Sequence, residues 1–334
     1  MIEKSVHRMR SHAKPCLPSG PLRTICALGI AGVSWLLMAL PAAAAPAVPI
    51  VPIRFLFNIT NDFLQPSDVA VSGSGRIYVV DGVNNQIKVC GPAGRPLSAF
   101  GSSGSGDGQF RHPLGIDVDR SGKIYVADSG NHRVQIFAPN GAFSARIDLP
   151  GKKEKPADPT DVAVDAGRGR LYVVDNDNHR FFIYDLATLK LTKTVGAPGE
   201  REMEFRYPFF MALNKKKDLF IVDVINTRVQ EISPQGRFIT YVGGWGVEKG
   251  HFFRPKGVAV DRSDRVYVSD SYMGIIQVFD PQGKFSGVLG ETGRKTLHRF
   301  TTPVGLFIDA HNRLYVVEMQ ANRVGVYQIG TGGR

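Results

Sequence analysis

Three carboxylates stand where a repeated pattern in this chain otherwise has small or apolar residues. Asp117 occupies a position that reads Ala70, Ala163, Ala212, Ala259 and Phe307 in the other copies of the pattern. Asp68 and Asp161 replace a glycine found elsewhere as Gly115, Gly257 and Gly305, and Lys256 is the cation closest to them. Ca²⁺ and other hard cations require several oxygen ligands, so Asp68, Asp117 and Asp161 are candidate metal ligands. The alternative is that these acids cap backbone groups or pair with neighbouring Arg and Lys.

The pattern that exposes these departures returns six times at an almost constant interval. Each copy opens on a proline, with steps of 47, 46, 49, 47 and 48 residues between Pro66, Pro113, Pro159, Pro208, Pro255 and Pro303. An acidic residue that closes a YVxD run keeps the same phase, at Asp81, Asp128, Asp175, Asp223, Asp270 and Glu318. Periods near this length are typical of propellers or solenoids.

Each copy contains short runs rich in Val, Ile, Tyr and Phe, separated by turn-forming residues, and none has helical periodicity. In the second copy the predicted strands are Leu114–Val118, Lys123–Ala127, Arg133–Phe137 and Ala142–Ile147. Four strands without a helix make one blade of a radial array. The chain is therefore predicted to be all-β, a six-bladed propeller with blades near 66–101, 113–149, 159–196, 208–243, 255–290 and 303–329.

The propeller arrangement predicts how the two ends of the chain meet and which residues lie at the centre. The sixth copy lacks a fourth strand, and the spare segment Ile53–Ile59 is predicted to complete it and close the ring. The first strand of every blade lines the centre, so Asp68, Asp117, Asp161 and Lys256 are predicted to lie near the mouth of a central channel.

Two stretches carry a resemblance to a known family. YVADSGNHRVQIF (125–137) and PKGVAVDRSDRVYVSD (255–270) resemble the NHL-repeat propellers, and the likeness extends over residues 53–329. The resemblance implies the fold and leaves the function open, since the family includes extracellular sensors, RNA-binding modules and a zinc-dependent lyase. That lyase carries channel histidines, whereas the residues after the opening prolines here are Ser67, Leu114, Thr160, Phe209, Lys256 and Val304.

Residues 1–45 differ in kind from the repeats. A basic start precedes the apolar run ICALGIAGVSWLLMAL, which is 16 residues long, and Ala43-Ala44-Ala45 follows. This order predicts a signal peptide, and the mature chain is predicted to be one domain, 46–334. The alternative is an uncleaved membrane anchor, the only membrane attachment that we expect. Export to the periplasm or the outside disfavours nucleic acid as a partner.

The recurring acid and the N-x-R that follows it, such as Asp128 with Asn131 and Arg133, are interpreted as structural because they repeat in successive copies. The loops that join blades should share one face with the loops between second and third strands. On that face Phe209, Trp245 and Arg254 are candidate contacts, because binding surfaces favour large rigid side chains. The alternative for the aromatic residues is packing under their own loops.

These features predict an exported, non-catalytic binding or scaffold module of the bacterial cell envelope. Its partner would be a protein, a glycan or an anionic surface recognised by the loop-rich face. No catalytic residue is assigned, and the only cofactor considered is Ca²⁺ or another divalent cation. The alternative function is a metal-dependent hydrolase or lyase with an ion in the central channel.

Overall fold

The computed structural model describes residues 48–293 and 296–330. The chain divides into the units Met1–Ala45 and Pro46–Arg334, and the architecture below is that of the second unit. The predicted signal peptide, 1–45, lies outside the described residues.

The described residues form an all-β fold of four-stranded blades. Four separate sheets contain β2 (Val69–Val71), β3 (Ile77–Asp81), β4 (Gln86–Cys90) and β5 (Pro96–Phe100); β8 (Pro113–Val118), β9 (Ile124–Asp128), β10 (Arg133–Phe137) and β11 (Phe143–Asp148); β12 (Pro159–Asp165), β13 (Arg170–Asp175), β14 (Arg180–Asp185) and β15 (Leu191–Val195); and β16 (Pro208–Leu213), β17 (Leu219–Asp223), β18 (Arg228–Ile232) and β19 (Phe238–Val242). The strands predicted in the second copy agree with β8–β11 to within one residue at each end.

An eight-stranded sheet holds the remaining long strands. Its order is β20 (Pro255–Val260), β21 (Val266–Asp270), β22 (Ile275–Phe279), β23 (Phe285–Glu291), β1 (Ile50–Ile59), β26 (Arg323–Ile329), β25 (Arg313–Glu318) and β24 (Pro303–Ile308). The short strands β6 (Ser102–Ser103) and β7 (Gln109–Phe110) pair within a loop. Residues 48–293 and 296–330 contain two single-turn 3₁₀ segments, η1 (Ser129–Asn131) and η2 (Met319–Ala321), and no helix there is long and apolar enough to cross a membrane.

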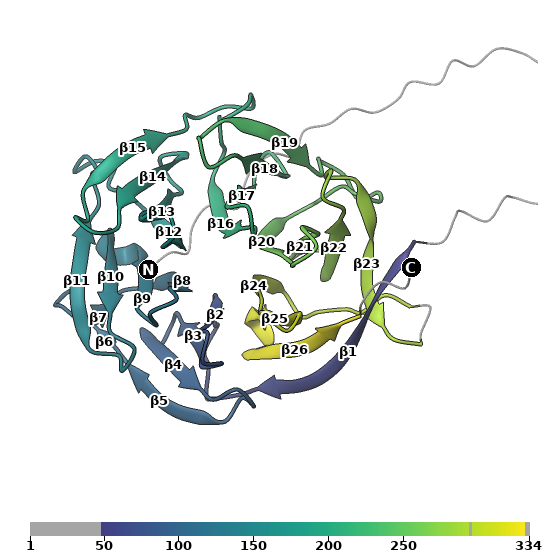
Figure 1. Cartoon of the computed structure of the whole chain (residues 1–334), viewed down its shortest axis with the longest axis horizontal. Helices are drawn as coiled ribbons and strands as arrows, with labels where there is room; N and C mark the ends of the chain where they lie inside the picture. The colour runs from purple at the N-terminus through teal and green to yellow at the C-terminus, as the bar shows by residue number, and fades with distance from the viewer. Residues whose placement is uncertain (1–47, 294–295, 331–334) are drawn as a thin grey trace, which may run out of the picture. The chain divides into compact units, whose positions relative to one another are not determined.

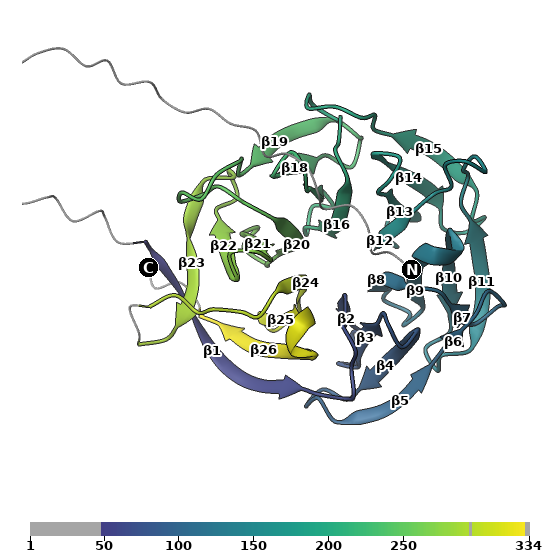
Figure 2. The same ribbon diagram turned by 180° about the vertical axis from the view of Figure 1, so that it is seen from behind.

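The blades stand radially around a common centre, with the first strand of each blade innermost (Figure 1). The same ring is seen from behind in Figure 2. The hydrophobic core lies between neighbouring blades, where Tyr125 and Val134 of one blade cluster with Val162 and Phe182 of the next. Large aromatic side chains suit this position because each buries an extensive apolar surface between two stacked sheets.

The strand β1 contacts two partners. Its second half pairs antiparallel with β26, from Ile53 opposite Ile329 to Ile59 opposite Val324. Its first four residues pair parallel with β23, starting with Ile50 opposite Val288. β1 therefore begins three residues before the predicted segment Ile53–Ile59, and these added residues join the edge of the β20–β23 blade.

Candidate functional site

A cavity of about 320 Å³ lies among the innermost strands, and Asp68, Asp117 and Asp161 all line it. Apolar residues also line it, with Ile116, Val162, Met211, Val258 and Leu306 among them. Arg120 and Lys217, from turns between first and second strands, also line it. The structure therefore brings the three sequence-predicted carboxylates around one space, at the end of the ring where the first strands of the blades finish.

Lys256, which the sequence groups with these acids, does not line the cavity. It follows the proline that opens β20, whereas the cavity is lined by Val258, Ala259 and Val260 at the other end of that strand. The Lys256 ammonium instead lies 3.9 Å from the centre of the Phe209 ring. A site made of all four residues, as predicted, therefore does not form around this cavity, which only the three carboxylates line.

Each of the three carboxylates accepts a hydrogen bond from the innermost strand of the next blade. Oδ2 of Asp68 accepts from the backbone N–H of Ile116 at 3.0 Å, and Oδ2 of Asp117 accepts from Val164 at 2.8 Å. Oδ2 of Asp161 accepts from Met211 at 2.7 Å. The innermost strand is the edge of its sheet, so these N–H groups would otherwise lack a partner. The geometry assigns the acids a role in joining adjacent blades.

The glycines of the same repeat position are explained by this contact. A Cβ atom at Gly115 would collide with Asp161 of the next blade, and one at Gly305 would collide with Asp68. Glycine in one blade thus gives room for aspartate in the following one. Two such pairs occur, Gly115 with Asp161 and Gly305 with Asp68, because innermost strands approach closely there.

Burial raises the pKa of all three carboxyl groups. Loss of solvation raises the pKa of Asp68 to about 8 and that of Asp117 to about 6. For Asp161 burial is again the main cause, and the nearby Asp68 carboxyl raises its pKa further. Within the described residues, no group of three His, Cys, Asp or Glu side chains is placed to hold a metal ion. The carboxyl oxygens are engaged with backbone donors in this arrangement.

The raised pKa of Asp68 predicts a loss of stability as the pH rises. Below about pH 4 the carboxyl is protonated in both the folded and unfolded states, whereas above about pH 8 folding must bury a charge. We expect Asp68→Asn to reduce the fall in unfolding free energy between about pH 5 and pH 8 by roughly 4 kcal/mol. Urea unfolding at the two pH values measures it, with exposed Asp107→Asn as the control that keeps the wild-type slope. An unchanged slope in Asp68→Asn would exclude this carboxyl as the cause.

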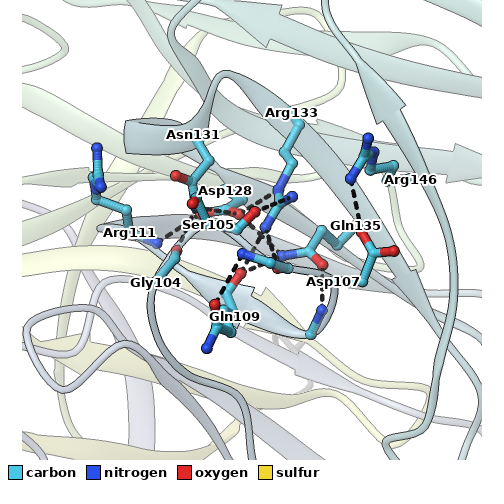
Figure 3. Close-up of polar contacts among 12 residues, drawn as sticks. Gly104, Ser105, Asp107, Gln109, Arg111, Asp128, Asn131, Arg133, Gln135 and Arg146 are labelled. Carbon is cyan, nitrogen blue, oxygen red and sulfur yellow. Dashed lines mark hydrogen bonds and ion pairs between the residues drawn. The ribbon is translucent and has the colours of Figure 1, made fainter.

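The acid that recurs at the end of each second strand holds a loop in place. Asp128 is fully buried and accepts hydrogen bonds from the backbone N–H of Arg111 at 2.8 Å, Asn131 Nδ2 at 2.9 Å and Arg133 Nε at 2.8 Å (Figure 3). Arg133 in turn donates to the carbonyl oxygens of Ser105 and Gly106 in the loop between blades. The same contacts recur around Asp175 and Asp223, so this motif is structural, as its repetition indicates.

Backbone hydrogen bonds join the loops between blades to the loops between second and third strands. The face of the ring that carries both kinds of loop is called the loop face. The backbone N–H of Ile225, between β17 and β18, donates to Arg206 O, and Ser271, between β21 and β22, donates to Arg254 O. Each pair joins a loop inside a blade to the loop that arrives from the preceding blade. This supports the sequence-based expectation that the two kinds of loop lie together.

The three proposed contacts of the loop face differ in exposure. Trp245 is 77% exposed, and Arg254 is also exposed. Phe209 is partly buried, with its ring centre 4.8 Å from that of Phe210 and with the Lys256 ammonium on its face. Trp245 is thus available to a partner, and Phe209 packs largely within the protein.

Sequence reasoning missed two exposed residues beside Trp245. Val247 and Tyr272 are each 70% exposed, and the Tyr272 ring lies 4.4 Å from that of Phe253. The sequence does distinguish Tyr272, because no other copy of the repeat has an aromatic residue at this position. The other copies hold Val83, Gly130, Asp177, Ile225 and Gln320. An aromatic residue in this loop position departs from the pattern as clearly as Asp117 does in its strand.

Comparison with known proteins confirms the resemblance that the sequence motifs carry. Residues 63–90, 110–137, 157–184 and 252–279 match the family described as NHL repeat. No curated protein sequence matches the chain.

Solved structures resemble it in fold. A gluconolactonase from Xanthomonas campestris has a TM-score of 0.62 at 14% identity, covering 86% of this chain and 99% of that one. A protein of unknown function from Bacteroides thetaiotaomicron has a TM-score of 0.62 at 17% identity, covering 84% and 73%. Virginiamycin B lyase from Staphylococcus aureus has a TM-score of 0.57 at 14% identity, covering 83% and 100%. At these identities the likeness shows the fold alone.

Proposed function

Because the chain is an NHL-repeat β-propeller, a fold that serves many unrelated functions, we propose from its own surface that it is a non-catalytic binding or scaffold module acting through the loop face. The observation that carries the proposal is the exposure of Trp245, Val247 and Tyr272. Exposed apolar side chains that gather on a polar-rimmed face are typical of interaction sites. The partner is a protein, a glycan or an anionic surface.

We also infer that the ring has six blades, the sixth made of β24, β25, β26 and β1. The inference is supported by the antiparallel pairing of β1 with β26, which gives the three last strands a fourth. We place the protein outside the cytoplasm, in the periplasm or beyond. That placement rests on the sequence pattern of residues 1–45, with a membrane contact only if this leader stays attached.

The proposal predicts that the loop face, and no other exposed apolar site, captures a partner. Full chain carrying Trp245→Ser and Tyr272→Ser should retain at most about a tenth of a partner captured from a cell-envelope extract by the wild type. The matched control is Leu97→Ser with Leu191→Ser, two exposed residues on outer strands, and it should retain the partner. Quantitative mass spectrometry of the captured material measures this. Equal losses in both double variants would contradict a role for the loop face.

The rival function is a metal-dependent hydrolase or lyase, and the cavity around Asp68, Asp117 and Asp161 is the observation that favours it. The engagement of the three carboxyl groups with backbone donors weighs against it. Elemental analysis of the purified full chain separates the two functions. About one ion per chain in the wild type, absent after Asp117→Ala, would favour the enzyme; equal and negligible metal in both would favour the binding module.

A further inference from the structure

The most exposed apolar residues of the loop face lie over the β20–β23 blade. Among the described residues, the three most exposed large hydrophobic side chains are Trp245, Val247 and Tyr272. They lie in two loops, 243–254 and 271–274, which are joined by the hydrogen bond from Ser271 N to Arg254 O at 3.0 Å. Phe253 completes the group through its ring contact with Tyr272. We call Trp245, Val247, Phe253 and Tyr272 the aromatic loop surface.

Two cations without carboxylate partners stand at the inner end of this surface. In the described residues, the Arg254 guanidinium and the Lys256 ammonium make no ion pair and donate no side-chain hydrogen bond; Lys256 has only the Phe209 ring beneath it. Burial lowers the pKa of Lys256, and the neighbouring charge of Arg254 lowers it further. An anion bound beside the two cations would offset both effects by stabilising the charged ammonium.

The neighbouring loop over the β16–β19 blade has the opposite charge balance. Loop 196–207, over the β16–β19 blade, contains Glu200, Arg201, Glu202, Glu204 and Arg206, with three acids against two cations. An ion pair of 2.8 Å joins Arg206 to Glu200 there. Loop 243–254 has the single acid Glu248 against the two cations Lys249 and Arg254. Of these two loops, only the one over the β20–β23 blade combines exposed aromatic residues with an excess of positive charge.

The chemistry of the surface favours a protein segment over a sugar. Polar side chains beneath the loops are engaged in holding them: Asp270 accepts from the backbone N–H groups of Phe253 and Arg254, and Gln277 bonds Gly250 N and His251 O. Asp270 and Gln277 are therefore not available to orient sugar hydroxyls, as a glycan site requires, and the two cations are the polar groups that the surface offers. The aliphatic Val247 beside aromatic rings suits apolar side chains, and two unpaired cations suit carboxylates.

We propose that the aromatic loop surface, together with Arg254 and Lys256, binds an acidic segment of a partner protein. Carboxylates of the segment lie against Arg254 and Lys256, and its apolar side chains lie against Trp245 and Tyr272. The proposal rests on the binding function above and deepens it by naming the class of partner. The exposed rings supply contact area at low entropy cost, and the cations supply selectivity and a fast, salt-dependent encounter.

Selection from a random peptide library displayed on phage tests the chemistry directly. The immobilised full chain is the bait, and full chain with Tyr272→Ser and Arg254→Ser is used to remove phage that bind elsewhere. We expect the surviving peptides to be enriched in Asp or Glu together with Leu, Ile, Phe or Tyr. Survivors without acidic enrichment, or no survivors beyond those that the variant also binds, would overturn the proposal.

The selected peptides then serve as probes in a binding titration. Full chain carrying Trp35→Phe keeps Trp245 as its one tryptophan, so its fluorescence reports on the surface itself. Lys256→Gln should weaken binding of an acidic peptide about tenfold, and Lys256→Arg should restore most of it. The matched control is Lys193→Gln, an exposed lysine on β15, which should leave the affinity unchanged. Equal affinities of the wild type and Lys256→Gln would overturn the role of this cation.

Two further probes separate this inference from the function on which it rests. Sulfated oligosaccharides and vesicles of anionic phospholipid are titrated against the same variants. One of these probes could bind the wild type, bind the Tyr272→Ser, Arg254→Ser double variant more weakly, and displace the selected peptides. That result would overturn the acidic-segment proposal, while the loop face would remain a binding site. If partner capture survives Trp245→Ser with Tyr272→Ser as well, the proposed role of the loop face in binding is overturned.

Discussion

Deleting residues 46–60 is expected to abolish the cooperative unfolding transition of the protein. The deletion removes β1, whose Ile53 and Ile59 are 1% and 0% exposed, and it uncovers the hydrogen-bonding edges of β26 and β23. Both edges would be left as unpaired backbone, and the apolar clusters on either side of β1 would open to water. Circular dichroism during heating and urea titration measure the result. A melting transition like that of the wild type would contradict closure of the ring by β1.

Point substitutions in the same strand provide the matched controls. Arg54→Ser changes an exposed residue of β1 and should leave the transition in place. Ile53→Ala and Ile59→Ala remove buried side chains, and each should lower the unfolding free energy by about 2–5 kcal/mol while the transition stays cooperative. This graded series distinguishes the loss of the strand from the loss of one apolar contact.

Asp128→Ala is expected to lower the unfolding free energy by about 3–5 kcal/mol. The carboxylate is the partner of Arg133, whose residue is only 3% exposed, and it also accepts from Asn131 and Gln135 (Figure 3). Without it, a buried guanidinium and the backbone N–H of Arg111 lose their acceptor. Chemical unfolding of the full chain measures the difference.

The same region supplies a control of the opposite kind. Asp107 pairs with Arg146 at 2.9 Å, but both side chains are about half exposed. Asp107→Ala should therefore change the unfolding free energy by less than about 1 kcal/mol. If Asp107→Ala and Asp128→Ala lowered the unfolding free energy by the same amount, burial would not explain the contribution of the recurring acid to stability.

The strands could be predicted from the sequence because each position of the repeat can be compared across six copies. Strands β8–β11 lie within one residue of their predicted bounds, and the acid of the YVxD run has the structural role that its repetition indicates. The parallel pairing of Ile50–Ile53 with β23 was not predicted. It depends on backbone groups at a sheet edge, which leave no pattern in the side chains.

The candidate site was predicted in part, and the reason lies in distances between blades. Departures from the repeat drew attention to Asp68, Asp117 and Asp161, which do line one cavity. Their hydrogen bonds to the next blade could not be predicted, because they depend on how closely innermost strands approach. Lys256 stands one position before the column of Asp68 and Asp161, and successive side chains of a strand point to opposite faces, so it does not share their cavity.

The pairing of β1 with β26 ties the beginning of the folded unit to its end. A linear repeat array can lose its terminal units one at a time, since each unit contacts only its neighbours. Here the terminal strands hold each other, so we expect the unit to unfold as a whole rather than fray. A chain cut short before Arg323 would leave Ile53 and Ile59 with no strand to cover them. Incomplete chains would thus expose an apolar edge that marks them for proteases, while complete ones would hide it.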